Sequence, residues 1–533
     1  MNYSPEQIFN EWRSGMNFKS SIGAKGLYEQ TKINERFFIG DQWYGAKCGN
    51  DRPLVRHNVI KRIGDYKMSV LLSGPIKIYY SAEGVPNTIE MKQKIKNTRR
   101  SIANGEALGE LSYDEEISLV MSALNDYQSV TSERVKFESV AEQALRNAFI
   151  SGTGIVYTYW DSDIPTGLYA DDKRTVAIKG DIRCESLNIE NVYFGDPYNP
   201  DLQSQPYIII ANRVTLDEAV REALKYNEVC PEIKPESDGK VTVLTRLWKE
   251  YEGGNVRVMA QKVVADGVIR AAFDIGVRVY PMAKFCWERR ENSPYGDSEI
   301  TYLIPNQIAI NRMITSGVWS TMMGGMPTMI VNADVIDGEI TNDPGQIIKV
   351  FGSGEDVNNA VRYVTPPDIS DAFNGMVDPL IKNTLTQSGA NNAALGDVNP
   401  DNTSAIKELR NAARLPLVVL ESRYHAFLEE ISRIWVEFWI TQYGKRRIKI
   451  QDENGDWYFD FDADRYRTLL INAKAEVSLN NSNNEENTIK ILDNLLSMGA
   501  ITVAQYLKRL PRGVISNINE LISETEVVRN DGN

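Results

Sequence analysis

Histidine and cysteine are scarce in this chain, and their scarcity rules out several kinds of catalytic and metal site. Only two histidines, His57 and His425, occur among 533 residues, so the sequence offers no histidine-based triad, no His-rich zinc site and no HExxH helix. The four cysteines lie far apart and form no CxxC pair: Cys48, Cys184, Cys230 and Cys286. We therefore expect reduced, buried thiols rather than a zinc site or a disulfide framework.

Motifs for nucleotide or metal binding are also missing. No GxxxxGKS/T phosphate loop occurs, and the Gly-Ser-Gly stretch at 352–354 lacks a strand–loop–helix context, so we interpret it as a turn. Asp460, Asp462 and Asp464 alternate like the acids of a calcium loop, but Arg465 stands where such a loop needs glycine. We interpret these acids as the wet face of a strand. The sequence thus predicts no metal and no cofactor, and its many carboxylates leave an acid-pair hydrolase open.

Positive charge is in short supply as well. The net charge is −13, with 59 basic against 72 acidic residues, and no basic stripe of the kind that grips nucleic acid is visible. Residues 298–405 hold twelve acids and four bases, so they carry eight of the thirteen net negative charges. A passage lined by this segment would repel phosphates and favour sliding over gripping. Ordinary solvated loop acids are the alternative, and the sequence leaves both open.

A long, purely hydrophobic run is absent. The longest uncharged stretch, 313–333, could span a bilayer by length, but it is interrupted by polar and helix-breaking residues: Ser316, Gly317, Ser320, Thr321, Gly324, Gly325, Pro327 and Asn332. The first nine residues are polar and contain no apolar signal-peptide core. We expect a soluble, intracellular protein with several domains, because 533 residues exceed what one core accommodates.

The first 297 residues predict a mixture of helices and strands. Apolar periodicity indicates helices at 88–103, 114–129 and 133–151. Strands are predicted at 155–160, 207–214, 241–251, 256–264 and 277–287, with a hairpin turn at Gly253-Gly254.

A different pattern begins near Ser298. Apolar residues recur at helical spacing as far as Met322, and Arg312 is the single charged residue after Glu299. An exposed helix would carry more charge, so this helix must be covered on most sides, by its own domain or by neighbouring subunits. Residues 326–367 predict short strands and turns, and 370–386 predict a second helix that contains a proline.

The remaining chain begins with a loop and a long helix. Residues 387–403 are rich in Gly, Asn, Ala and Asp, which is typical of a functional or disordered loop. Ser404 caps a long amphipathic helix that Pro416 should kink. Strands around an Asn454-Gly455 turn are predicted within 447–479, followed by a polar linker at 480–484 and short helices at 488–496, 503–510 and 515–522.

This order of segments resembles that of tailed-bacteriophage portal proteins, the head-to-tail connectors. The stretch 35–43, Glu-Arg-Phe-Phe-Ile-Gly-Asp-Gln-Trp, resembles their early F-x-G-x-Q-W element. Residues 58–61 followed by 71–78 are similar to their first wing helix and strand, and 293–298, Ser-Pro-Tyr-Gly-Asp-Ser, resembles the beginning of their stem. The resemblance covers nearly the whole chain in order.

The resemblance implies an α+β multidomain portal fold with a mixed α/β wing, a two-helix stem, a small β-containing clip, a long kinked helix and a short helical crown. The N-terminal part of the wing would be 1–297, the stem helices 298–325 and 370–386, and the clip 326–367. The tunnel loop would be 387–403, the long wing helix with its strands 404–479, and the crown 480–533.

The resemblance also implies a non-enzymatic function in the virion. Portal proteins form a dodecameric ring at one capsid vertex, a channel for packaging and ejecting double-stranded DNA. The large terminase docks during packaging and supplies ATP hydrolysis, and head-completion or adaptor proteins dock later. Capsid and scaffold proteins would be further partners. The subunit would be made in the host cytoplasm, and no membrane is involved.

Within the tunnel loop, the resemblance implies contact with DNA that is independent of sequence. The residues expected to approach DNA are Gly389, Asn391, Asn392, Gly396 and Asp397, and Lys382 is expected to face the channel. Two other functions stay open, namely another virion adaptor such as a tail or baseplate component, and a soluble acid-pair hydrolase.

Overall fold

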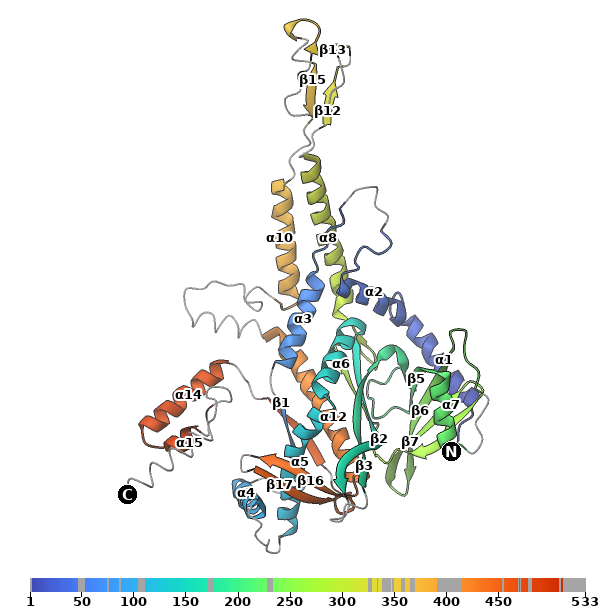
Figure 1. Ribbon diagram of the computed structural model, residues 1–533, viewed down its shortest axis with the longest axis vertical. Coiled ribbons are helices and arrows are strands. Elements are labelled where there is room, and N and C mark those ends of the chain that lie inside the picture. The colour runs from blue at the N-terminus through green and yellow to red at the C-terminus, as the bar shows by residue number, and fades with distance from the viewer. Residues whose placement is uncertain are drawn as a thin grey trace.

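The computed structural model describes residues 2–46, 53–73, 76–85, 88–103, 111–169, 177–227, 233–324, 328–332, 334–337, 347, 349–355, 360–364, 370–390, 415–452, 455–467, 469, 471–477, 482–507 and 510. Figure 1 shows a broad body from which a pair of helices rises to a small β tip, with a short helical unit beside the body near the C-terminus. The predicted mixed α/β multidomain architecture is confirmed. The portal identity of the individual segments stays a prediction.

Three helices open the body, and local capping explains where each begins or ends. They are α1 (Pro5–Ser21), α2 (Leu27–Ile39) and α3 (Val59–Leu72). The Ser4 side chain accepts a hydrogen bond from the Gln7 amide at the start of α1, and the Asn58 side chain accepts one from the Lys61 amide at the start of α3. Gly40 ends α2 in a left-handed conformation, with φ 93°.

The next three helices confirm two predictions and correct a third. α4 (Ile89–Ala103) and α5 (Tyr113–Arg134) occupy the helices predicted at 88–103 and 114–129. The helix predicted at 133–151 begins later, as α6 (Phe137–Ser151). Lys136 takes a left-handed conformation, with φ 52°, and thereby separates α6 from α5.

A five-stranded antiparallel sheet forms one side of the body. Its order is β4 (Val192–Phe194), β5 (Tyr207–Thr215), β6 (Lys240–Glu252), β7 (Asn255–Val264) and β8 (Gly267–Asp274). The strands predicted at 207–214, 241–251 and 256–264 are confirmed, and the Gly253-Gly254 turn joins β6 to β7 at φ 58° and 86°. α1 packs against this sheet through Ile8 and Phe9, and α7 (Leu216–Tyr226) packs through Ala219 and Ala223.

A three-stranded sheet supports the main hydrophobic core. β2 (Thr153–Tyr169) lies between β3 (Ala177–Asn188) and β9 (Met282–Cys286), and α6 and α12 (Val418–Gln442) pack against it. The strand predicted at 155–160 is thus part of a longer one. The strand predicted at 277–287 is too long, because Ile275 and Val277 hydrogen-bond with Val258 of β7 instead of continuing β9.

The second half of the sequence returns to the same body. β18 (Ile471–Val477) pairs with β1 (Ile76–Ala82), and β16 (Lys445–Asp452) pairs with β17 (Gly455–Asp462). The strands predicted within 447–479 are confirmed, whereas the pairing of β18 with β1 was not predicted, and Asn454 lies outside the described residues. Of the three alternating acids, Asp462 and Asp464 do not lie on a solvent-exposed face of a strand. Asp464 lies in α13 (Ala463–Tyr466), and the Asp462 side chain is 23% exposed and lies 3.8 Å from both Lys445 and Arg465.

The two helices that rise from the body, which we call the stalk, are α8 (Glu299–Gly324) and α10 (Ser370–Gln387) (Figure 1). Both were predicted, and both continue through an internal proline, Pro305 in α8 and Pro379 in α10. The tip consists of two strand pairs, as predicted for 326–367: β12 (Thr328–Val331) with β15 (Val361–Val364), and β13 (Ile336–Asp337) with β14 (Lys349–Val350).

The C-terminal predictions match the structure in part. Leu415–Leu417 forms a 3₁₀ turn before α12, so Pro416 marks a change of helix type and does not kink α12 from within. α14 (Ser482–Ser497) begins inside the segment predicted as a polar linker, and it packs on α15 (Val503–Leu507) around Leu492 and Leu507. The helix start predicted at Ser404 and the helix predicted at 515–522 lie outside the described residues.

Two cysteines lie in the described part of the chain, Cys184 and Cys286; both are free thiols, as expected, but both are partly buried and not fully buried. The Trp435 indole donates a hydrogen bond of 3.2 Å to the sulfur of Cys184. Burial raises the pKa of Cys184 to about 11, so this thiol stays protonated at neutral pH. Cys48 and Cys230 lie outside the described residues.

Gly152 ends α6 at a point where the backbone leaves no space for a side chain. Its φ is 89°, and a Cβ atom there would lie 2.2 Å from the carbonyl oxygen of Gly296. Gly239 has a similar φ of 76°, but a Cβ atom there would meet nothing within 4 Å. Alanine substitutions at the two glycines therefore distinguish the cost of a left-handed backbone, which both share, from the cost of steric overlap, which only Gly152 has.

We expect Gly239→Ala to lower the free energy of unfolding by about 1–2 kcal/mol, the cost of a left-handed alanine. Gly152→Ala should cost a further 1–3 kcal/mol, roughly the penalty of overpacking. Urea unfolding followed by circular dichroism measures both changes. Equal losses in the two variants would contradict this account of Gly152.

Candidate functional site: the base and flanks of the stalk

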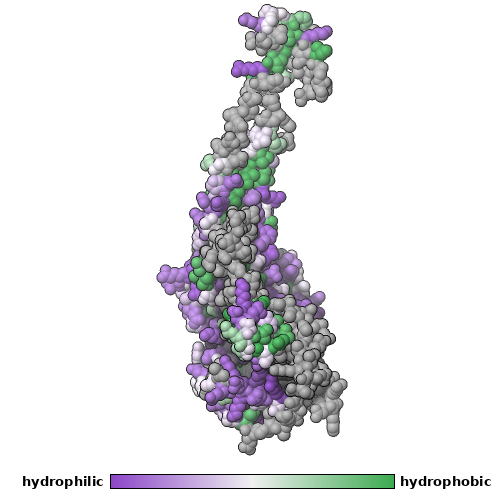
Figure 2. Space-filling view, turned by 90° about the vertical axis from the view of Figure 1, so that its left-hand side faces the viewer, coloured by the Kyte–Doolittle hydropathy of each residue, from purple (hydrophilic) through white to green (hydrophobic). Residues whose placement is uncertain are grey.

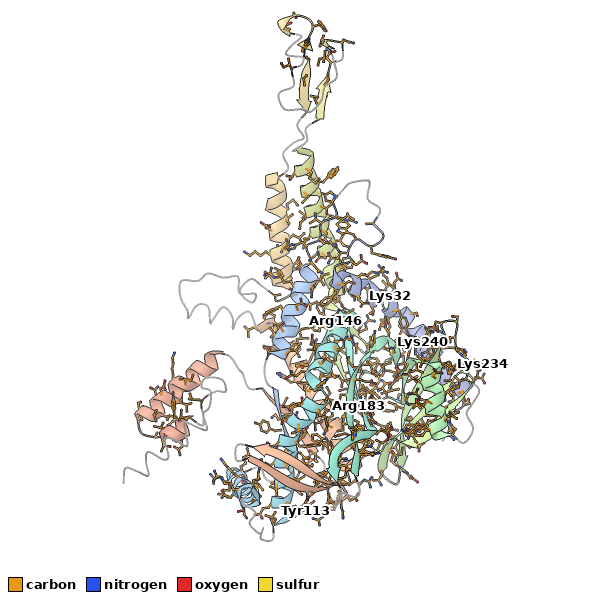
Figure 3. The ribbon with its side chains drawn as sticks, viewed as in Figure 1. Lys32, Tyr113, Arg146, Arg183, Lys234 and Lys240 are labelled. Atoms are coloured by element: carbon orange, nitrogen blue, oxygen red, sulfur yellow. The ribbon has the colours of Figure 1, made fainter. Side chains whose placement is uncertain are left out.

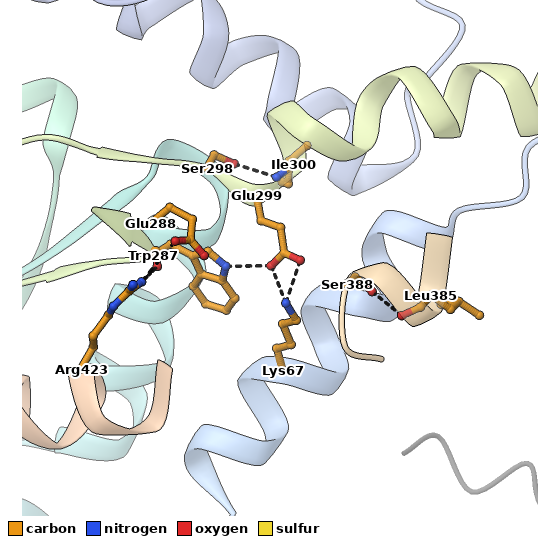
Figure 4. A network of polar contacts seen from close by, with 9 residues as sticks. All are labelled: Lys67, Trp287, Glu288, Ser298, Glu299, Ile300, Leu385, Ser388 and Arg423. Carbon is orange, nitrogen blue, oxygen red and sulfur yellow. Dashed lines mark hydrogen bonds and ion pairs between the residues drawn. The ribbon is translucent and has the colours of Figure 1, made fainter. Parts of the chain in front are cut away.

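Ser298 fixes the point where the stalk leaves the body (Figure 4). Its hydroxyl accepts a hydrogen bond from the Ile300 amide at 3.1 Å and donates one to the Phe149 carbonyl at 2.5 Å. The first contact satisfies an amide that a helix start leaves unpaired. The second ties the first turn of α8 to the end of α6.

Glu299 forms a nearly buried ion pair at the same place. The Lys67 ammonium on α3 donates to both carboxylate oxygens, at 2.7 and 2.9 Å, and the Trp287 indole donates to one of them at 2.8 Å. The Lys67 and Glu299 side chains are only 11% and 13% exposed. A carboxylate at a helix N-terminus is favoured by the helix dipole. Removing either charge would leave the other buried without its partner.

Gln307 and Asn311, one helical turn apart on α8, hold the segment that leads into α3. The Gln307 carbonyl oxygen accepts from the Val59 and Ile60 amides at 2.9 and 3.3 Å, and its amide nitrogen donates to the His57 carbonyl at 2.7 Å. Asn311 accepts from the His57 amide at 3.1 Å. Both amide side chains are almost fully buried, at 1% and 2% exposure. They therefore fasten α8 to α3 without any charge.

Further contacts join α10 and α12 to this base. The Asn306 side chain of α8 donates to the Thr384 hydroxyl of α10 at 3.2 Å. Arg423 of α12 donates to the Trp287 carbonyl at 2.6 Å and lies 3.4 Å from Glu288 (Figure 4). The lower stalk is thus held by elements from both halves of the sequence.

The upper stalk carries apolar side chains that the described chain leaves uncovered. Val318 and Met322 on α8 are 36% and 45% exposed, and Met376 on α10 is 64% exposed. At the tip, Ile347 and Phe351 are 87% and 63% exposed. Figure 2 shows hydrophobic residues over the stalk and the tip on the face that it presents. The chain itself therefore meets the expectation of a mostly covered helix only in part, since Ile300 and Ile310 are buried whereas Tyr302 is 62% exposed.

Two of the residues predicted to meet DNA fall within the described chain. Lys382 is exposed on α10, and Gly389 is buried just beyond the end of that helix. Gly389 has φ 79°, and a Cβ atom there would lie 3.1 Å from Pro416. Asn391, Asn392, Gly396 and Asp397 lie outside the described residues, so the structure does not test the tunnel loop as a unit.

The basic side chains labelled in Figure 3 come from several parts of the body: Lys32 from α2, Arg146 from α6, Arg183 from β3, Lys240 from β6 and Lys234 from the segment before β6. Within the described residues, no three His, Cys, Asp or Glu side chains are grouped to hold a metal ion. Nor does any helix of that part of the chain have the length and hydropathy to cross a membrane.

Comparisons with known proteins show no family for this chain and a distant structural similarity. No protein-family model and no curated protein matches it. One matching chain among solved structures belongs to a structure described as "Virion of native gene transfer agent (GTA) particle". The alignment covers 96% of this chain and 98% of that chain, with 11% identity and a TM-score of 0.35. A similarity this distant shows neither the family nor the function of the chain.

We expect Gln307→Ala to loosen the attachment of α3 to α8. The substitution leaves the buried Ile60 amide without its acceptor, at about 1–3 kcal/mol, and leaves the Val59 amide with the His57 carbonyl alone, at 3.0 Å. Hydrogen–deuterium exchange of peptides covering 53–63 should accelerate, and the free energy of unfolding should fall. Gln387→Ala, at an exposed position of α10, is the matched control. Unchanged exchange at Val59 and Ile60 in the Gln307 variant would contradict the role given to this side chain.

Proposed function

We propose that this chain is the portal protein of a tailed bacteriophage. In this proposal the subunit has no enzymatic activity and assembles with copies of itself into a dodecameric ring at one capsid vertex of the virion. The ring provides the channel through which double-stranded DNA enters and leaves the capsid. The order of segments supports the proposal, since a mixed α/β body is interrupted by a helix, a β tip and a returning helix.

The observation that carries the proposal is the exposure of apolar side chains on the upper stalk. Val318 and Met322 of α8 remain 36% and 45% exposed and Met376 of α10 remains 64% exposed, whereas Ile300 and Ile310 near the base are fully buried. Full burial of such a side chain contributes about 1.5–3 kcal/mol. A neighbouring stalk would cover this surface, and head-to-tail contacts that repeat around an axis close into a ring.

Charge supports a channel that DNA slides through. The segment 298–405 carries an excess of eight acidic residues, and Lys382 is the one base between Asp371 and Lys407. An acidic bore repels phosphates, so it lowers adhesion to the duplex. Lys382 and the tunnel loop would then be the places where the ring approaches DNA.

The tip would be the docking surface for other proteins. Its exposed Ile347 and Phe351 side chains suit a protein contact, because burying apolar surface against a partner is favourable. The partners would be the large terminase during packaging and head-completion or adaptor proteins afterwards. Capsid and scaffold proteins would contact the body at the vertex.

Charged substitutions on the upper stalk test this assembly. We expect the wild-type chain to sediment as a large oligomer, and Met322→Glu and Met376→Glu each to weaken assembly by about tenfold or more, because each places a charge in an apolar contact. Sedimentation velocity over a range of concentrations measures the effect.

Leu224→Glu is the matched control, since Leu224 is 58% exposed on α7 of the body. Circular dichroism should show the same helix content in all three variants. An oligomer that persists unchanged in both stalk variants would count against the proposed packing of stalks.

A further inference from the structure

A cavity of about 310 Å³ lies beside the base of the stalk. Its walls are the loop between β4 and β5, strand β9, the turn between β10 (Glu288–Arg289) and β11 (Gly296–Asp297), and one residue of α12. The lining residues are Pro200, Asp201, Lys284, Phe285, Cys286, Arg289, Arg290, Ser293 and Arg423. The volume is at the lower end of the range for small-ligand pockets.

Four basic side chains face this cavity together with one carboxylate, that of Asp201. Two of the bases already have acidic partners nearby, since Arg290 lies 2.5 Å from Asp297 and Arg423 lies 3.4 Å from Glu288. Neither Lys284 nor Arg289 forms an ion pair with a residue that the structure describes. The cavity therefore holds an excess of positive charge, although the chain as a whole is acidic.

Lys284 and Arg289 leave donors available to a ligand. The Lys284 ammonium donates to the carbonyls of Pro200 and Pro294, at 2.5 and 3.2 Å, and these neutral acceptors do not cancel its charge. Arg289 is exposed, and it makes no hydrogen bond or ion pair with another residue that the structure describes. A guanidinium offers paired N–H groups that match two oxygens of one oxyanion.

The walls of the cavity are held in place without a ligand. On one side, the buried Gln205 side chain accepts from the Asp196 amide at 2.8 Å and donates to the Asn199 carbonyl at 2.8 Å. On the other side, the Gly296 amide donates to the Thr153 hydroxyl at 2.8 Å. A ligand would therefore lose little binding free energy to ordering of the site.

Burial lowers the pKa of Lys284, and the nearby charge of Arg289 lowers it further, while Cys286 and Asp201 act in the opposite direction. A partly buried ammonium of this kind is stabilised when an anion binds beside it.

The geometry points to a binding site for a phosphate group, with Arg289 and Lys284 as its principal donors and with Arg290 and Arg423 at its edge. The site does not depend on ring formation, so it goes beyond the proposed function. The phosphate group could come from free inorganic phosphate or from the phosphodiester backbone of DNA, and both present the same tetrahedral oxyanion to the guanidinium.

Isothermal titration of the full-length protein with inorganic phosphate, at constant ionic strength in chloride, tests the site. We expect saturable binding by the wild-type chain, an affinity about tenfold lower for Arg289→Ala because one charge-assisted contact is lost, and no measurable binding for Arg289→Glu. Arg221→Ala, at an exposed position of α7, is the charge-matched control and should bind as the wild type does.

A second titration identifies the source of the phosphate. Short duplex DNA that displaces phosphate from the wild-type chain assigns the site to the nucleic-acid backbone, and absence of displacement assigns it to the free anion. The inference is overturned if the wild-type chain binds no phosphate, or if both Arg289 variants bind it with wild-type affinity. Because titration reads the site in any state of assembly, its failure is distinct from a failure to form rings.

Discussion

The stalk depends on the buried polar contacts at its base. Glu299 is paired with Lys67, and the Gln307 side chain accepts hydrogen bonds from the amides that begin α3. These contacts fix the direction of α8 where it leaves the body. Breaking a buried ion pair by removing one partner typically costs about 3–5 kcal/mol. That is a large fraction of the net stability of an ordinary domain, roughly 5–15 kcal/mol. These contacts hold the lower half of a nearly uncharged helix inside the body, and the upper half extends beyond it.

Side chains of α8 therefore meet different surroundings near the base of the helix and near its top. In the lower half, amide side chains are tolerated because each finds backbone partners in the segment before α3. In the upper half, Val318 and Met322 have no comparable cover from the body. In the proposed assembly this surface would contact another copy of the chain, and repeated contact around an axis would turn a set of stalks into the wall of a channel.

Sequence patterns predicted the elements whose signals are local. The Gly253-Gly254 turn and the apolar periodicity of α8 and α10 each act within a few residues, so these predictions are confirmed. The break at Lys136 was missed because its residue type does not mark a left-handed position. The late start of β9 was missed because it depends on contacts of Ile275 and Val277 with the distant Val258. The roles of Gln307 and Lys67 were missed for the same reason, although two amides one turn apart in an apolar helix were a signal. The cavity at Arg289 was missed as well, because it combines residues from four separate segments.

Negative-stain electron microscopy of the purified full-length chain tests the central claim most directly. The account predicts closed rings with a central hole, in which stalks from neighbouring copies lie side by side around the axis. Particles that remain single, each with one protruding stalk, at every concentration would contradict it. So would a closed assembly in which the stalks point away from one another and enclose no channel.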